Sequence, residues 1–380
     1  MNIIKSVKSI LAEIDWILFS SVILLSFFGL ITMNSFVGEN TFFQKQLVWL
    51  AVSVVAFFLV SLVDFKFLRR TPVVVWLYSI AVLSLAVLFG VGSVFQGAQS
   101  WLNFGFFAFQ PADLAKLVLV ITLAKYFSRR HIEIRYFRHL IVSGVYAFIL
   151  FMLIFVQPDF GSALIIFFVW FGMVLASGLS KKHLVGLLVI GALTFMALWT
   201  FVLADYQKAR VMNFIHPLQD IRGTGYNAYQ SMISVGSGQL LGKGVGYGTQ
   251  SRLNFLPEYQ TDFIFAAFAE EWGFVGVLLL FGIYMILIWR ILANSILGAT
   301  NFESLFGIGV AVLFISHFIV HVGMNIGLMP ITGLTLPFMS YGGTNLLISF
   351  VALGIIMSMK RYARTAHRDL SRNEVVGVEY

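Results

Sequence analysis

An aspartate at the entrance to an apolar segment is the residue of this sequence best placed to do chemistry. Asp262 follows Pro257 and a polar run, and the residues from Phe263 onward are apolar except for Glu270 and Glu271. This pattern predicts a membrane-spanning helix with Asp262 in its first turn. There, partial desolvation raises the proton affinity of a carboxylate while water stays within reach. Asp262 is therefore a candidate general base for a lipid-borne substrate, or alternatively a helix cap or a charge favoured by the macrodipole.

Two glutamates follow Asp262 in the same apolar segment. On a straight helix, Glu270 and Glu271 lie about 12 Å deeper in the membrane than Asp262. That separation is too large for the closely spaced carboxylate pair of a retaining glycosidase. We expect both glutamates to belong to a buried structural network that neighbouring helices satisfy.

A second pair of ionisable residues lies at the start of another apolar segment. Asp113 and Lys116 are three residues apart, so they share a helical face and can neutralise each other. A lysine one turn into the membrane needs an acidic partner. In the alternative, Lys116 faces Asp262 across helices and either tunes the base or contacts a substrate phosphate.

Three short motifs place further polar residues between apolar segments. Gln157 and Asp159 flank a proline, which is typical of a turn and an N-cap but also allows a substrate contact. Lys243 lies among closely spaced glycines without the Ser or Thr that follows a Walker lysine, so we expect a turning loop that can contact a pyrophosphate. Ser340 belongs to the segment 330–344, which breaks the entrance to an apolar span and is predicted to line a cavity.

Two histidines share one face of an apolar segment. His317 and His321 are four residues apart, a spacing that can bind a metal ion. No acidic or third ligand accompanies them in that segment. Hydrogen bonding between helices is therefore the expected role.

The composition indicates an integral membrane protein. Of the residues, 59% are hydrophobic and 11% are charged, and the mean hydropathy is +0.90. The net charge of +8 comes from short basic clusters between apolar spans, which argues against nucleic-acid binding. The absence of cysteine excludes disulfides, thiolate metal sites and cysteine nucleophiles.

The apolar periodicity predicts an all-α fold with ten transmembrane helices. The expected spans are 16–36, 46–63, 73–92, 111–127, 139–157, 161–178, 184–204, 263–288, 305–328 and 341–359. The predicted organisation is an interfacial cytoplasmic helix at 1–14, helices one to seven within 15–204, a large extracytoplasmic loop at 205–262, helices eight to ten within 263–361, and a cytoplasmic tail at 362–380.

The distribution of basic residues predicts the orientation. Most of the 25 lysines and arginines fall into the loops on the side of the N-terminus, and the short loops of the other side carry almost none. Both termini should therefore be cytoplasmic, with Asp262 on the outer face. No nucleotide pool exists there, so an enzyme at this face could not draw on ATP.

Several motifs together resemble the SEDS family (shape, elongation, division and sporulation), and its RodA branch more than its FtsW branch. They are GAQSWLNFG, FQPADLAK, QPDFGSA, the loop motif ARV at 209–211, GTGYNAYQS, GSGQLLGKG, GTQSRLNFLPEYQTDFIFAAFAEEWG and GLMPITGLTLPFMSYGGTN, spread over nearly the whole chain. The chain departs from the family pattern at Ala112 and Asp113, where Ser-Glu is common, at Gln239, where Gly is common, and at Thr344 and Asn345, where Ser-Ser is common.

The resemblance implies a peptidoglycan glycosyltransferase of the bacterial cytoplasmic membrane. Such proteins polymerise lipid II alongside a class B penicillin-binding protein and other membrane proteins of the elongation machinery. Asp262 matches their essential aspartate, and we expect it to act as general base in an inverting displacement of undecaprenyl diphosphate. Lys116, Lys243 and Arg210, the last taken from the family's loop motif, or a divalent cation (Mg or Mn), would hold the diphosphate.

The remaining candidates have supporting roles. Gln157, Asp159 and Ser340 are predicted substrate contacts, while Asp113, Glu258 and Glu270 are predicted structural or tuning residues. Two rival functions stay open, namely a flippase for the lipid-linked precursor and a non-catalytic scaffold. Ionisable groups gather near the outer mouth rather than along a path through the bundle, which favours the transferase.

Overall fold

The computed structural model describes most of the chain. The described residues are 13–35, 41–95, 98–103, 105, 108–129, 137–179, 181–201, 208, 212, 225–253 and 255–376. Nearly all of the predicted interfacial helix at 1–14, and the candidate Arg210, lie outside them.

The structure is mostly helical. Before the large loop, the helices are α2 (Trp16–Asn34), α3 (Thr41–Leu62), the 3-10 helix η1 (Phe65–Arg69), α4 (Thr71–Val91), α5 (Pro111–Ser128), α6 (Phe137–Val156), α7 (Phe160–Ala176) and α8 (Lys181–Phe201). After residue 225 they are α10 (Tyr226–Ser237), α11 (Thr249–Arg252), α12 (Ile264–Ile296), α13 (Asn301–Asn325) and α14 (Gly343–Val376).

Within the described residues, seven helices are long and apolar enough to cross a membrane. These are α2, α3, α4, α6, α12, α13 and α14, and α7 is an apolar helix that is slightly shorter. The chain is therefore a multi-pass membrane protein. In α5, Asp113, Lys116 and Lys125 interrupt the apolar pattern, yet the helix is almost entirely buried because α4, α7 and α13 pack around it.

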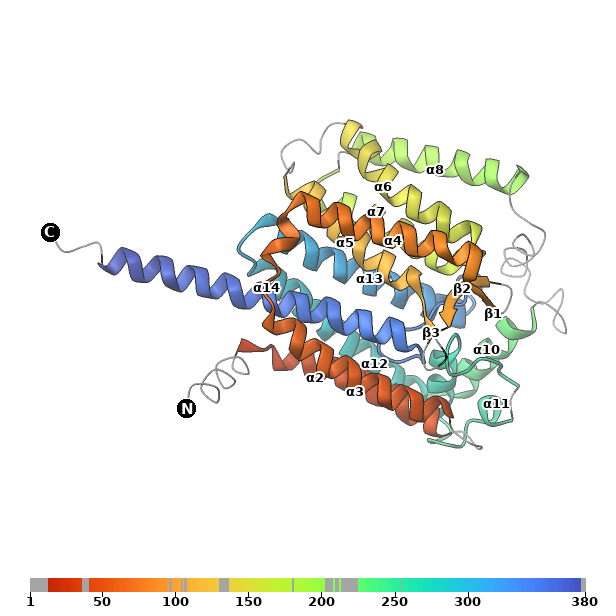
Figure 1. Ribbon diagram of the computed structural model, residues 1–380. Coiled ribbons are helices and arrows are strands. Elements are labelled where there is room, and N and C mark those ends of the chain that lie inside the picture. The colour runs from red at the N-terminus through yellow and green to blue at the C-terminus, as the bar shows by residue number, and fades with distance from the viewer. Residues whose placement is uncertain are drawn as a thin grey trace.

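The long helices lie side by side in one bundle (Figure 1). α14 packs along α3, α2 along α12, and α13 against both α5 and α7. α2 begins and α14 ends at the left of the view, and the strands, α10 and α11 lie at the right. The bundle thus has two distinct ends, and the right-hand one carries the strands, α10 and α11.

A small antiparallel sheet joins α4 to α5, so the all-α prediction is wrong in this detail. Strands β1 (Ser93–Phe95), β2 (Ala98–Asn103) and β3 (Ala108–Phe109) are ordered β1-β2-β3. The sequence here is short and rich in aromatics, which favour strands over helices. Leu102 pairs with Phe109, and this register leads the chain directly into α5.

α12 is not straight, because the chain reverses sharply at Gly273. Gly273 has φ 64° and ψ −168°, which is outside the helical region. The rings of Phe265 and Phe281 are 6.0 Å apart, whereas a straight helix would separate these residues by about 24 Å. The segment before Gly273 therefore folds back beside the segment that follows it.

This reversal corrects the predicted depth of Glu270 and Glu271. Trp272 packs against Phe28 near the end of α2, and Arg290 pairs with Asp15, which caps the start of α2. The part of α12 that runs along α2 to the opposite end of the bundle thus begins after Gly273. The two glutamates lie at the end of the bundle near α10 and α11, not about 12 Å deeper than Asp262.

The segment 326–342 between α13 and α14, which we call the re-entrant segment, enters the bundle without helical structure, as its prolines predict. The ring Nδ1 atoms of His317 and His321 lie 3.2 Å and 2.7 Å from the carbonyl oxygens of Thr335 and Leu334. Phe338 packs against Phe314, one helical turn below His317. Irregular backbone at this depth is tolerated because such side chains pair its polar groups.

Candidate active site at one end of the bundle

Asp262 lies in a tight turn directly before α12, rather than in the first helical turn. The helix starts at Ile264, and Asp262 is half-buried. Glu258 adopts a φ of 48°, and its carbonyl oxygen accepts the N–H groups of Thr261, Asp262 and Phe263. The backbone of Glu258 thus shapes the turn. A half-buried carboxylate at such a turn combines partial desolvation with access to water.

The end of the re-entrant segment holds this turn in place. The hydroxyl of Ser340 donates to the carbonyl of Thr261 at 2.7 Å and accepts the N–H of Leu336 at 2.8 Å. The N–H of Tyr341 donates to the carbonyl of Gln260 at 2.8 Å. Ser340 is buried and both bonds of its hydroxyl are to backbone groups, so the structure places this hydroxyl against the backbone of the turn.

Two residues next to Asp262 were not predicted from the sequence to be part of the site. Asn325, the last residue of α13, donates from its side-chain amide to the carbonyl oxygen of Asp262 at 3.0 Å. Gly333 has φ 71°, and a Cβ built on it would be 3.6 Å from Oδ2 of Asp262. The carboxylate of Asp262 therefore faces the re-entrant segment at a point that carries no side chain.

Lys116 has the local partner that its spacing allows. Its Nζ is 3.0 Å from Oδ1 of Asp113, and both side chains are 3% exposed. Asn345 donates to the same Oδ1 at 3.3 Å, and the three residues line a small cavity with His317. Asp113 and Asn345 are two of the departures from the family pattern, and they touch. Asp113 is shorter than the glutamate common at its position in the family, and Asn345 is longer than the serine common at its own position, so the two side chains still reach each other.

Gln157 and Asp159 stabilise the connection between α6 and α7. Asp159 caps α7 by accepting the N–H of Ser162 at 3.0 Å, and it also accepts the side-chain amide of Gln110 at 3.2 Å. Gln157 is 2% exposed and donates to the carbonyl of Leu85 at 2.7 Å. The turn and capping alternative accounts for both residues.

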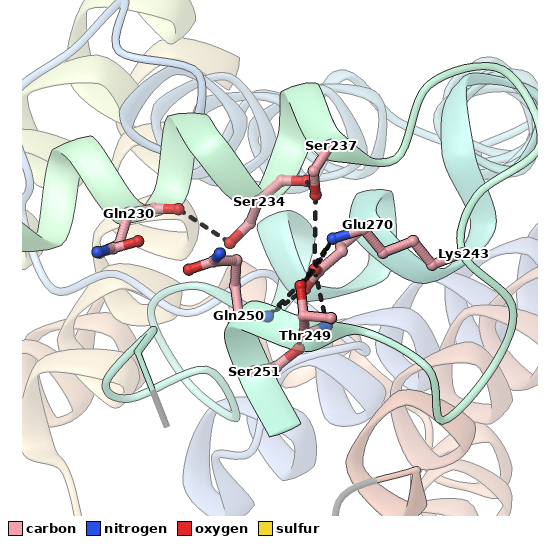
Figure 2. A network of polar contacts seen from close by, with 8 residues as sticks. All are labelled: Gln230, Ser234, Ser237, Lys243, Thr249, Gln250, Ser251 and Glu270. Atoms are coloured by element: carbon pink, nitrogen blue, oxygen red, sulfur yellow. Dashed lines mark hydrogen bonds and ion pairs between the residues drawn. The ribbon is translucent and has the colours of Figure 1, made fainter. Parts of the chain in front are cut away.

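Glu270 organises a polar network at the same end of the bundle (Figure 2). Its carboxylate is fully buried and accepts hydrogen bonds from the backbone and hydroxyl of Thr249 and from the backbone of Gln250. Lys243 pairs with it at 2.6 Å and also donates to the hydroxyl of Thr249 at 2.8 Å. Thr249 and Gln250 belong to α11, and the hydroxyl of Ser237 in α10 lies 3.5 Å from the same carboxylate, so neighbouring helices and Lys243 together satisfy it. The structure therefore brings Lys243 to Glu270.

Three glycines allow the loop 238–244 to pack directly on the reversal of α12. Added Cβ atoms on Gly238, Gly242 and Gly273 would lie only 2.0 Å, 2.1 Å and 2.2 Å from backbone atoms across this contact. The N–H groups of Lys243 and Gly244 donate to the carbonyls of Glu270 and Glu271. We call this contact between 238–244 and 269–275 the loop clasp.

No group of three metal-ligating side chains occurs among the residues that the structure describes. His317 and His321 bond to backbone carbonyls, which is the hydrogen-bonding role that the sequence favours, here with the re-entrant segment as partner.

The bundle and its acid-centred turn define a multi-pass membrane protein with a candidate site at one end. A family described as Cell cycle protein, comprising FtsW, RodA and SpoVE, matches residues 8–365. The chain therefore belongs to the FtsW/RodA/SpoVE family, which confirms the resemblance seen in its motifs.

Individual relatives agree with this assignment. The peptidoglycan glycosyltransferase MrdB of Escherichia coli K12 is 37% identical over 290 residues, covering 76% of this chain and 78% of that protein. A chain from a peptidoglycan synthase complex that coordinates polymerization and crosslinking matches with a TM-score of 0.80 at 30% identity, covering 92% of this chain and 98% of that one. The rod shape determining protein RodA of Thermus thermophilus matches with a TM-score of 0.68 at 29% identity, covering 91% and 96%.

Proposed function

We propose that this protein is a peptidoglycan glycosyltransferase that polymerises lipid II at the outer face of the bacterial cytoplasmic membrane. The observation that carries the proposal is the half-buried carboxylate of Asp262, held in a turn that Ser340 and Asn325 fix from the re-entrant segment and from α13. The names of the relatives supply the reaction class. A fixed carboxylate at the edge of the bilayer is suited to a substrate whose lipid stays in the membrane.

In the proposed reaction, Asp262 takes the proton of the acceptor sugar hydroxyl as its oxygen attacks the anomeric carbon of the donor. The new glycosidic bond forms as the bond to undecaprenyl diphosphate breaks, and the configuration inverts. The diphosphate leaves with the bonding electrons and needs no acid if cations absorb its charge. One carboxylate with basic residues is therefore sufficient.

The diphosphate would be held by basic residues. Arg210 is a candidate from the family's loop motif, and Lys116 and Lys243 are candidates that each have a carboxylate partner, Asp113 and Glu270 respectively. These two lysines would contact the diphosphate only by exchanging or sharing those partners. A divalent cation enters no step of this mechanism.

We further propose that ten helices cross the membrane, with both termini cytoplasmic. The ten are α2 to α8 and α12 to α14. Support comes from Figure 1, where α2 begins and α14 ends on one side of the bundle while α10 and α11 lie on the other. The large loop 205–262, which contains α10 and α11, would then be extracytoplasmic, with residues 362–380 as a cytoplasmic tail.

The proposed partner is a class B penicillin-binding protein, and the proposed role is in cell elongation with other membrane proteins of that machinery. The support is the match to a chain of a synthase complex and the identity to MrdB. Because the family also includes FtsW and SpoVE, the elongation role is a separate part of the proposal.

Purified protein supplied with labelled lipid II in detergent tests the function. We expect glycan chains from the wild type, and a loss of about 10²- to 10⁴-fold in Asp262→Asn, which is the range for removing a general base. Asp64→Asn, in the turn after α3, is the control and should polymerise normally. Lipid movement in vesicles without polymer would support the flippase instead, and neither activity would support the scaffold.

A further inference from the structure

Asn325 joins three elements around the turn that carries Asp262. It is the last residue of α13, and its side chain is fully buried. Its amide nitrogen donates to the carbonyls of Asp262 at 3.0 Å and of His321 at 2.8 Å. Its amide oxygen accepts the N–H of Ala266 at 3.1 Å and lies 3.4 Å from the hydroxyl of Ser231 in α10.

These contacts pair both ends of the primary amide. The side chain of asparagine has two N–H donors, and both have carbonyl acceptors here, while its oxygen accepts the N–H of Ala266; the hydroxyl of Ser231 donates chiefly to the backbone carbonyl of Asn325 at 2.9 Å. The partners also fix which end is which, because carbonyl oxygens can only accept and the N–H of Ala266 can only donate. Aspartate has the same size but no donor, so it would set an oxygen against two carbonyl oxygens.

The contact with Ala266 serves the start of α12. The first N–H groups of a helix lack partners within the helix, and the cap residue Phe263 has no side-chain acceptor. Asn325 supplies the missing acceptor from another helix. The same side chain thus fixes both the peptide group after Asp262 and the first turn of α12, which together set the direction of the Asp262 side chain.

We propose that Asn325 is a positioning residue for Asp262, which holds the carboxylate in line with the acceptor hydroxyl. The inference rests on the proposed function and adds the residue that orients its base. Ser340 fixes the preceding peptide group, at Thr261, so the two residues hold the turn from both sides of Asp262. A small displacement of the base is costly, since a shift of about 1 Å in a reacting group can reduce the rate about 100-fold.

The test compares Asn325→Asp with the matched control Asn294→Asp. Asn294 is also a buried asparagine, but it donates to Asp15 at the opposite end of α12. We expect Asn325→Asp to lower kcat by about 100-fold with little change in the KM for lipid II. Asn294→Asp should lower the thermal midpoint yet leave kcat close to the wild-type value.

A double-mutant cycle separates positioning from a merely structural role. If Asn325 acts through Asp262, the double variant of Asn325→Asp and Asp262→Asn should be no slower than Asp262→Asn alone. Additive losses, or an unchanged kcat in Asn325→Asp, would overturn the proposal.

Hydrogen exchange distinguishes failure of this inference from failure of the proposed function. The amides of residues 258–266 should exchange faster in Asn325→Asp than in the wild type or in Asn294→Asp. A wild type that makes no polymer contradicts the function, and this exchange still tests the positioning. Equal protection of 258–266 in all three proteins would refute it.

Discussion

Removing the carboxylate of Glu270 should release the loop 243–251 from the bundle. In Glu270→Ala, Lys243 loses its ion pair, and the backbone N–H groups of Thr249 and Gln250 lose their acceptor. The alanine offers no replacement, and the carboxylate site is fully buried, so water has little access to these groups. The loop should therefore open more often without unfolding the helices.

The size of the effect follows from these contacts. Removing one partner of a buried ion pair costs about 3–5 kcal/mol, and each buried donor left unpaired costs about 1–3 kcal/mol. The side chain of Lys243 is 29% exposed, so in the variant the lysine can turn toward water. The free-energy cost of losing the ion pair therefore lies at the lower end of the range of about 3–5 kcal/mol. We take about 3 kcal/mol, which is roughly a 100-fold increase in the opening equilibrium of the loop.

Hydrogen exchange followed by mass spectrometry measures this opening directly. Peptides that contain residues 243–252 should exchange roughly 100-fold faster in Glu270→Ala than in the wild type. Glu303→Ala is the control, because Glu303 is a buried acid that pairs with Arg69 elsewhere in the bundle. It should leave these peptides unchanged. Wild-type protection of 243–252 in Glu270→Ala would show that the loop is held by packing alone.

Two further predictions concern other parts of the bundle. Hydrogen bonds from Arg290 and Asn294 outweigh the opposing effect of burial and hold the pKa of Asp15 below its usual value of 3.8. The stabilisation that the ionised Asp15 carboxylate contributes is therefore complete above about pH 4 and is lost as the pH falls through the lower folded-state pKa. The thermal midpoint of the wild type should drop more steeply below pH 4 than that of Asp15→Asn. Parallel curves of thermal midpoint against pH would contradict this. Gly273→Ala places a Cβ at positive φ in direct conflict with backbone atoms, so the monodisperse fraction after size-exclusion chromatography should fall sharply. The control Gly282→Ala has open space around its added Cβ and should behave like the wild type. Equal monodisperse fractions in the two variants would refute the role of Gly273.

Helices were predictable from the sequence wherever a long apolar stretch is by itself enough to indicate a membrane-spanning helix. The reversal at Gly273 was not, because one glycine in an apolar pattern is also compatible with a continuous helix. Its cause lies elsewhere in the chain, since the loop clasp needs backbone contact between Gly273 and Gly242. The small sheet before α5 was missed for a similar reason, because its strands are only a few residues long.

The candidate site was predictable in part. Asp262 remains a prediction made from its position at an apolar boundary, whereas the ion pair of Asp113 and Lys116 was predictable from its helical spacing. The partner of Lys243 was missed because Glu270 is far from it in sequence and the predicted straight helix placed Glu270 elsewhere. Asn325 gave no signal, because a single amide at the end of an apolar helix becomes informative only when its partners are known.

The first part of α12 connects the two polar centres of this end of the bundle. Residues 264–271 are all buried, and their helix is about 12 Å long. Asn325 holds the end next to Asp262, and the loop clasp holds the end at Gly273. A helix this short and well packed moves as a unit, because protein interiors resist compression. A displacement of the loop 238–251 must therefore either break the loop clasp or shift the turn that carries Asp262. The bonds that Glu270 makes to Lys243, Thr249 and Gln250 tie this loop to the helix and decide between these outcomes.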